Sequence, residues 1–171
     1  MVNKLVLKQL FGVITFSLLC LCLSGCGYRV LGGSSLPFTT VKVGKIQNTT
    51  SEPKLEDIFY VALAEELLKR GVSVTDFSEN TIEGNINYFQ LVIVSEKKKY
   101  ASEYKIDLKG DFVIKGRDGK NREFKGVTSP FYESFYGPDT VNAIVASKET
   151  AAAEAVKRLA ASLVFEILIS Q

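Results

Sequence analysis

The chain has 171 residues, with 21 Lys and Arg, 19 Asp and Glu, and no histidine. The missing histidine removes the commonest general base and the commonest metal ligand from any candidate active site. The sequence also lacks a GxSxG nucleophile elbow, a Gly-rich phosphate loop and a CxxC pair. This composition argues against an enzyme, and we expect neither a metal nor a cofactor.

The first 26 residues have the pattern of a secretory signal. Lys4 and Lys8 precede an almost unbroken apolar run over residues 10–23, which Leu23-Ser24-Gly25-Cys26 closes. This pattern is typical of a signal peptide, and the run is shorter than the about 20 residues that span a bilayer. The last four residues resemble the lipobox of bacterial lipoproteins. We therefore expect residues 1–25 to be removed and Cys26 to carry S-diacylglycerol and N-acyl groups. The alternative is an ordinary signal or an uncleaved anchor, in which Cys26 has no role.

Residues 26–37 are rich in Gly and Ser and show no periodicity, which predicts a lipidated tether. About ten such residues reach at most ~36 Å when fully extended. Gly27 stands where an Asp tends to retain lipoproteins in the inner membrane, so it favours the outer membrane. The remaining residues, 38–171, are enough for one domain with its own core.

This domain begins with a strand and a helix. Residues 38–46 are β-branched and partly alternating, which predicts a strand. Apolar residues then recur at spacings of three and four over 54–70, which predicts an amphipathic helix that ends at the following glycine. Pro53 suits its first turn, with Ser51 or Glu52 near the cap.

Three further strands follow. Residues 81–94 alternate, but the apolar positions change parity near Phe89, which indicates a bulge or a turn off the sheet. Residues 104–115 alternate between apolar and charged side chains, so one face of this strand is expected in water. A Gly-Arg-Asp-Gly hairpin turn leads into the last strand, over about 121–131.

A long helix over 140–168, capped by Asp139 or Thr140, completes the chain. The order β-α-β-β-β-α predicts an α+β two-layer sandwich, with both helices on one face of a mixed sheet of about four strands. A right-handed crossover makes the first two strands parallel. The side chains expected in the core are Leu55, Phe59, Leu63, Ile106, Leu108, Phe112, Val156 and Leu159.

Positive charge is concentrated in residues 97–125, which hold ten Lys and Arg against five Asp and Glu. Arg binds phosphate through a bidentate fork and Lys as a point charge. The predicted export excludes nucleic acid, and the abundant phosphorylated amphiphile of the outer membrane is lipopolysaccharide (LPS). The alternative is a solvated hairpin whose lysines prevent edge-strand pairing. The candidate LPS-binding residues are Lys97, Lys98, Lys99, Arg117, Lys120 and Arg122.

Four aromatic side chains occur within residues 131–136: Phe131, Tyr132, Phe135 and Tyr136. Alternation places aromatics on both faces of an extended segment. One face can belong to the core, and the other is available to anchor a partner.

Several short motifs, in this order, resemble those of the LPS-assembly lipoprotein family LptE. They are Cys26-Gly27-Tyr28-Arg29-Val30, Val41-Lys42-Val43, Asn48, Glu52-Pro53, Glu83-Gly84-Asn85-Ile86, Glu103-Tyr104-Lys105-Ile106 and the Ala-rich last helix. The resemblance implies an outer-membrane lipoprotein on the periplasmic face that plugs the β-barrel LptD, helps it assemble, and binds LPS. It places the family's basic LPS contacts in the regions of 97–99 and 117–122.

Two other functions stay open. One is a scaffold or pilot lipoprotein for another envelope assembly, such as a secretin or the barrel-assembly machinery. The other is a lipid-anchored periplasmic enzyme, which the lack of histidine disfavours.

Overall fold

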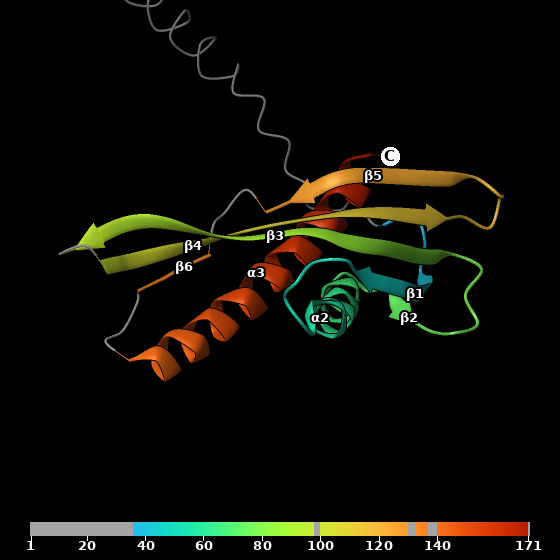
Figure 1. Ribbon diagram of the computed structural model, residues 1–171. Coiled ribbons are helices and arrows are strands. Elements are labelled where there is room, and N and C mark those ends of the chain that lie inside the picture. Colours follow the sequence, from blue (N-terminus) through green and yellow to red (C-terminus); the bar gives the residue numbers. More distant parts are fainter. Residues whose placement is uncertain (1–35, 98–99, 130–132, 137–139, 171) are drawn as a thin grey trace, which may run out of the picture. The chain divides into compact units, whose positions relative to one another are not determined.

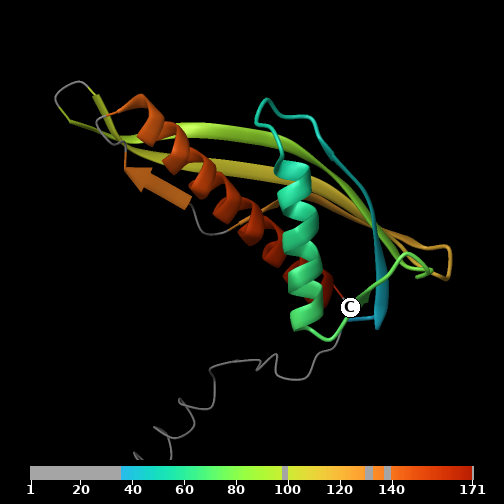
Figure 2. The ribbon, with the colours of Figure 1, turned by 90° about the horizontal axis from the view of Figure 1, so that it is seen from below.

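The computed structural model describes residues 36–97, 100–129, 133–136 and 140–170. Two helices lie on one face of a mixed sheet, so the domain is an α+β two-layer sandwich, as predicted (Figures 1 and 2). The elements are β1 (Thr40–Asn48), α2 (Leu55–Lys69), β2 (Ser73–Val74), β3 (Thr81–Lys97), β4 (Tyr100–Lys115), β5 (Asn121–Thr128), β6 (Glu133–Tyr136) and α3 (Val141–Ile169).

The sheet has the order β2-β1-β3-β4-β5, and β6 pairs with a separate stretch of β4. β1 runs parallel to β3, which confirms the parallel pairing predicted for the strands before and after α2. β3 and β4 form a long antiparallel ribbon that pairs Thr81 with Lys115 at one end and Lys97 with Tyr100 at the other. The predicted change of parity in β3 is a bulge at Asn87, which the ladder skips between Ile86 and Tyr88.

The core lies between the helices and the sheet. All eight side chains predicted to be buried are buried, and Phe59 of α2 stacks on Phe112 of β4 with ring centroids 4.8 Å apart. The opposite face of β4 carries Lys105, Asp107 and Lys109, which leaves the helix-free face of the sheet polar, as alternation requires.

The prediction of about four strands missed β2 and β6. Each is too short, at two and four residues, to show alternation, and each is held by pairing with a longer neighbour. No helix within the described ranges combines the length and the apolar character needed to cross a membrane.

The cap expected at Ser51 or Glu52 is wrong. α2 begins after Lys54, whose φ of 65° is left-handed. The preceding turn is organised by Asn48 instead, whose side-chain amide donates to the Glu52 carbonyl at 2.7 Å and whose Oδ1 accepts from the Thr50 amide at 3.0 Å. At the other end, Gly71 (φ 77°) terminates the helix as predicted.

Candidate functional site

The six basic residues predicted to bind LPS do not form one cluster. Arg117, Lys120 and Arg122 lie on the β4–β5 hairpin, whereas the backbone of Lys97 lies at the far end of the β3–β4 ribbon (Figure 1). β4 has 16 residues, so the two ends are separated by about 50 Å at the usual rise of a strand. Lys98 and Lys99 are outside the described residues.

The β4–β5 hairpin is a tight turn built by its glycines and Asp118. The amide of Gly119, at φ 74°, donates to the Gly116 carbonyl at 3.1 Å, and the Gly116 amide donates to the Lys120 carbonyl at 2.9 Å. The Lys120 amide donates to Asp118 Oδ1 at 3.1 Å. This backbone hydrogen bond, followed by the charge of Lys120, lowers the pKa of Asp118. The carboxylate therefore stays ionised beside the lysine.

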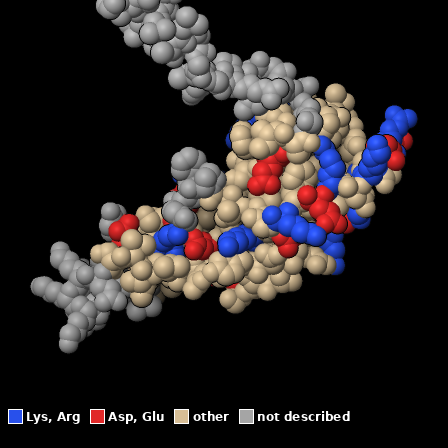
Figure 3. Space-filling view, turned by 90° about the horizontal axis from the view of Figure 1, so that it is seen from above, with Lys and Arg blue, Asp and Glu red and all other residues tan. Residues whose placement is uncertain are grey.

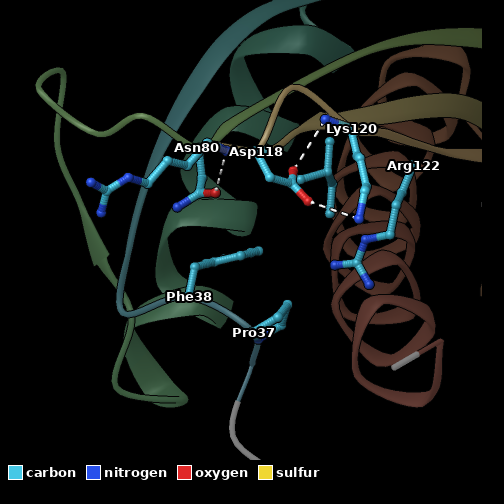
Figure 4. A pocket seen from close by; sticks show the side chains of 9 residues that line it. Pro37, Phe38, Asn80, Asp118, Lys120 and Arg122 are labelled. Carbon is cyan, nitrogen blue, oxygen red and sulfur yellow. Dashed lines mark hydrogen bonds and ion pairs between the residues drawn. The ribbon is translucent and has the colours of Figure 1, made fainter.

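A pocket of about 590 Å³ opens behind this turn (Figure 4). Its wall is the hairpin with Lys120 and Arg122, and its apolar side is formed by Phe38 and Ile114. Ile114 and Arg122 are cross-strand partners in β4 and β5. The full lining is Pro37, Phe38, Asn80, Ile114, Gly116, Arg117, Asp118, Lys120 and Arg122.

The three cations of the pocket differ in their partners. Arg117 Nε lies 2.7 Å from Glu79 Oε2, and Lys120 Nζ lies 3.5 Å from Asp118 Oδ2. Arg122 is half-buried and has no ion pair with any residue of the described ranges. Figure 4 shows the Arg122 and Lys120 side chains at the same side of the cavity. Arg122 is therefore the cation best placed to take an added anion.

Of the aromatic segment over residues 131–136, the structure describes residues 133–136, and the Phe135 side chain belongs to the core. Phe135 was a candidate partner contact, but its side chain is 8% exposed and stacks on Tyr104 at 5.1 Å between centroids. It pairs with Tyr104 across β4 and β6, which is why it belongs to the core. Phe131 and Tyr132 lie outside the described residues, and the structure describes only the backbone of Tyr136. Cys26 also lies outside them.

Sequence reasoning missed the pocket's contributions from outside the hairpin. Pro37 was assigned to the tether, yet it lines the pocket, and Leu36 before it is buried in the core with 6% exposure. Asn80 is also brought in by the sheet, because β3 begins beside the end of β4; its Oδ1 accepts from the Arg117 amide at 3.3 Å. No local pattern marks either residue, since their proximity depends on strand order.

The helix-free face of the sheet offers a different surface. Lysines and carboxylates alternate over it, as Figure 3 shows, with Lys115 2.7 Å from Glu83 and Lys125 2.8 Å from Glu123. Because these charges pair across and along strands, this face has no concentrated positive field. Among the described residues, no group of three or more Asp, Glu, Cys or His side chains is arranged to hold a metal ion.

Two solved structures with TM-scores of 0.50 and 0.52 support the fold. A Xanthomonas campestris protein is 13% identical and has a TM-score of 0.52, with 81% of this chain and 88% of that one covered. A candidate lipoprotein from Caulobacter crescentus is 13% identical, with a TM-score of 0.50 and coverage of 73% and 89%. Rare lipoprotein B from Shewanella oneidensis is also similar. It is 15% identical, with 77% of this chain and 92% of that one covered and a TM-score of 0.48.

Sequence comparison identifies the family. No curated protein matches the chain significantly. The family model described as LptE, lipopolysaccharide-assembly, matches residues 38–167, which comprise nearly all of the described domain. This chain therefore belongs to the LptE family of lipopolysaccharide-assembly proteins.

Proposed function

We propose that this protein is an outer-membrane lipoprotein, acylated at Cys26 after removal of residues 1–25, that works in LPS export. In this proposal it plugs the barrel LptD on the periplasmic side of the membrane, helps the barrel assemble, and contacts LPS. The family match over residues 38–167 is the observation that carries the assignment to LPS assembly. The lipobox-like Leu23-Ser24-Gly25-Cys26 supports the anchor.

The hairpin pocket is the surface we propose for LPS. Arg122 and Lys120 provide donors for a phosphate, and the edges of Phe38 and Ile114, which are otherwise buried, form the apolar floor of the pocket. Asp118 opposes the binding of an anion, so the net attraction is modest and depends on Arg122.

We place the domain boundary before Leu36 rather than after residue 37, because Leu36 packs in the core.

Co-purification tests the partner. The full chain, pulled down from detergent-solubilised outer membranes, is expected to bring an LPS-exporting barrel with it. Recovery of a secretin or of the barrel-assembly machinery instead would favour the scaffold alternative. Intact-mass measurement of the same sample should give a chain starting at Cys26 with added lipid mass, and an unmodified thiol there would refute the anchor.

LPS binding tests the pocket. Lys120→Gln with Arg122→Gln should weaken LPS binding by about 10- to 100-fold at low salt, the range for losing a charge-assisted hydrogen bond of about 1.5–3 kcal/mol. The difference should shrink in 1 M salt, where the Debye length falls to about 3 Å. Lys125→Gln is the matched control, since Lys125 is an exposed β5 lysine that does not line the pocket.

A separate variant at Lys97, Lys98 and Lys99 tests the other end of the ribbon. If only this variant weakens binding, LPS contacts the far end. Equal binding of the Lys120 and Arg122 variant and the wild type at low salt would remove the pocket from the LPS site. Increased self-association without loss of binding would support edge protection as the role of the charges.

A further inference from the structure

The loop between β2 and β3 holds a large aromatic side chain out in solvent. Phe77 is 95% exposed, whereas the other exposed large hydrophobic side chains of the described residues range from 37% to 59%. The loop is anchored to β1 on both sides of Phe77: the Thr75 amide donates to the Val41 carbonyl at 2.9 Å, and the Lys42 amide donates to the Asn80 carbonyl at 2.8 Å. The exposed ring therefore stands on an ordered turn.

Phe77 lies beside the point where the chain enters the domain. A hollow of about 620 Å³ is lined by residues 36–40, by residues 77–80 and by Arg117. Leu36 and Phe38 are buried in the core, so the entry point is fixed in this hollow. The ion pair between Arg117 and Glu79 joins the hairpin tip to the same loop. We call Pro37, Phe77, Arg117 and Lys120 the entry surface.

Charge on the entry surface is nearly balanced. Arg117 and Lys120 are highly exposed, but Glu79 and Asp118 accompany them. Asp76, next to Phe77, is 3.6 Å from Lys42. With the half-buried Arg122, four cations face three carboxylates. Any ligand of this surface is therefore held mainly by the aromatic ring, with a small preference for anions.

We infer that the entry surface rests on the membrane surface, with the Phe77 ring in the bilayer interface and Arg117 at lipid phosphates. The inference rests on the proposed acylation of Cys26. Cys26 and Leu36 are ten positions apart, so the distance between them is at most ~36 Å in any conformation. The anchor therefore keeps this surface near the bilayer. Aromatic side chains at this depth bury their apolar surface while nearby cations meet headgroups.

A single phenylalanine would not bind a membrane alone, but here it does not have to. The anchor makes the contact intramolecular, and a link as short as ten residues gives an effective concentration of about millimolar. A contact with a dissociation constant below about 1 mM is then populated more than half of the time. The contact would orient the domain on the membrane rather than attach it.

The chain contains no tryptophan, so the fluorescence of a single introduced tryptophan reports only on its own position. Phe77→Trp in the full acylated chain, reconstituted in phosphatidylethanolamine and phosphatidylglycerol vesicles with brominated acyl chains, should show blue-shifted emission and strong quenching. Val145→Trp is the control, because Val145 is also exposed but lies near the start of α3, beside the β6 end of the ribbon (Figure 2). It should be quenched severalfold less. Phosphatidylcholine vesicles should preserve most of the difference, since the charges nearly balance.

Equal quenching at positions 77 and 145, in chains that carry the acyl mass and float with the vesicles, would overturn the inference and leave the anchor standing. A chain without acyl mass that does not float would overturn both. A blue shift of the Phe77→Trp emission that occurs only after the barrel is added would also overturn the inference, because the surface would then contact protein and not lipid.

Discussion

Replacing Gly84 by alanine tests the packing at the centre of the sheet. A Cβ at this position would lie 2.1 Å from Cδ1 and 2.8 Å from Cε1 of Phe112, and 2.9 Å from the Asp111 carbonyl oxygen. Ordinary contact begins near 3.4 Å, so the ring would have to retreat by more than 1 Å. Phe59 stacks against Phe112 at 4.8 Å, and both rings are buried, so there is little space for that movement.

The sign of the effect depends on this clash. Gly84 lies in a strand with an ordinary φ, and without a clash alanine would stabilise the protein by about 0.4–1 kcal/mol through the unfolded state. Overpacking costs about 1–3 kcal/mol. We expect Gly84→Ala to lower the free energy of unfolding by about 1–2 kcal/mol, seen as a lower urea midpoint at unchanged slope.

Two further variants isolate the cause. Gly116→Ala should cost less than Gly84→Ala, about 1 kcal/mol, because its Cβ would displace the Asp118 carboxylate and weaken one hydrogen bond from the Lys120 amide but would meet no buried ring. Phe112→Leu should relieve the clash, so Gly84→Ala should cost much less in that background than in the wild type. A neutral or stabilising Gly84→Ala, or strictly additive effects, would refute the reasoning.

Two other perturbations follow from the core and from α3. Leu108→Ala should cost about 2–5 kcal/mol in urea unfolding, and a loss under about 0.5 kcal/mol would contradict the burial of this face of β4. Burial raises the pKa of Glu166 above its ordinary value of 4.5, so the fold favours the protonated acid. Its contribution is therefore most favourable below pH 4.5 and is lost as the pH rises through the raised pKa. Glu166→Gln should be more stable than wild type at pH 7 and equal to it at pH 4, and a difference independent of pH would contradict this cause.

The sequence pattern predicted the elements that bury many side chains. β4 alternates cleanly because one of its faces meets the helices and the other meets water, and the parity change in β3 corresponds to the bulge at Asn87. Both helices were predicted to within two residues of their ends. Local patterns suffice where each residue's environment follows from its position along one element.

What the sequence did not predict depends on neighbours distant in the chain. The position of Phe135 in the core follows from β6 pairing with residues 103–106, near the start of β4, where the Phe135 ring stacks on Tyr104. Phe77 did carry a local signal, since it is the only aromatic residue in the polar run Asp76-Phe77-Ser78-Glu79-Asn80. An isolated aromatic side chain in such a run has no periodic partner to bury it, which is the physical reason that it stays exposed.

The length of the β3–β4 ribbon restricts how the two basic regions can act together. The regions share a run of sequence, but the ribbon holds them about 50 Å apart, which exceeds the about 40–45 Å thickness of a whole bilayer. If the entry surface rests on the membrane, a ribbon lying flat keeps both regions at one headgroup layer. A ribbon along the membrane normal puts its two ends at different depths. In either orientation no single phosphate group can reach both ends. A variant that removes all the charges at once cannot separate these geometries, whereas separate variants of the hairpin and of residues 97–99 can.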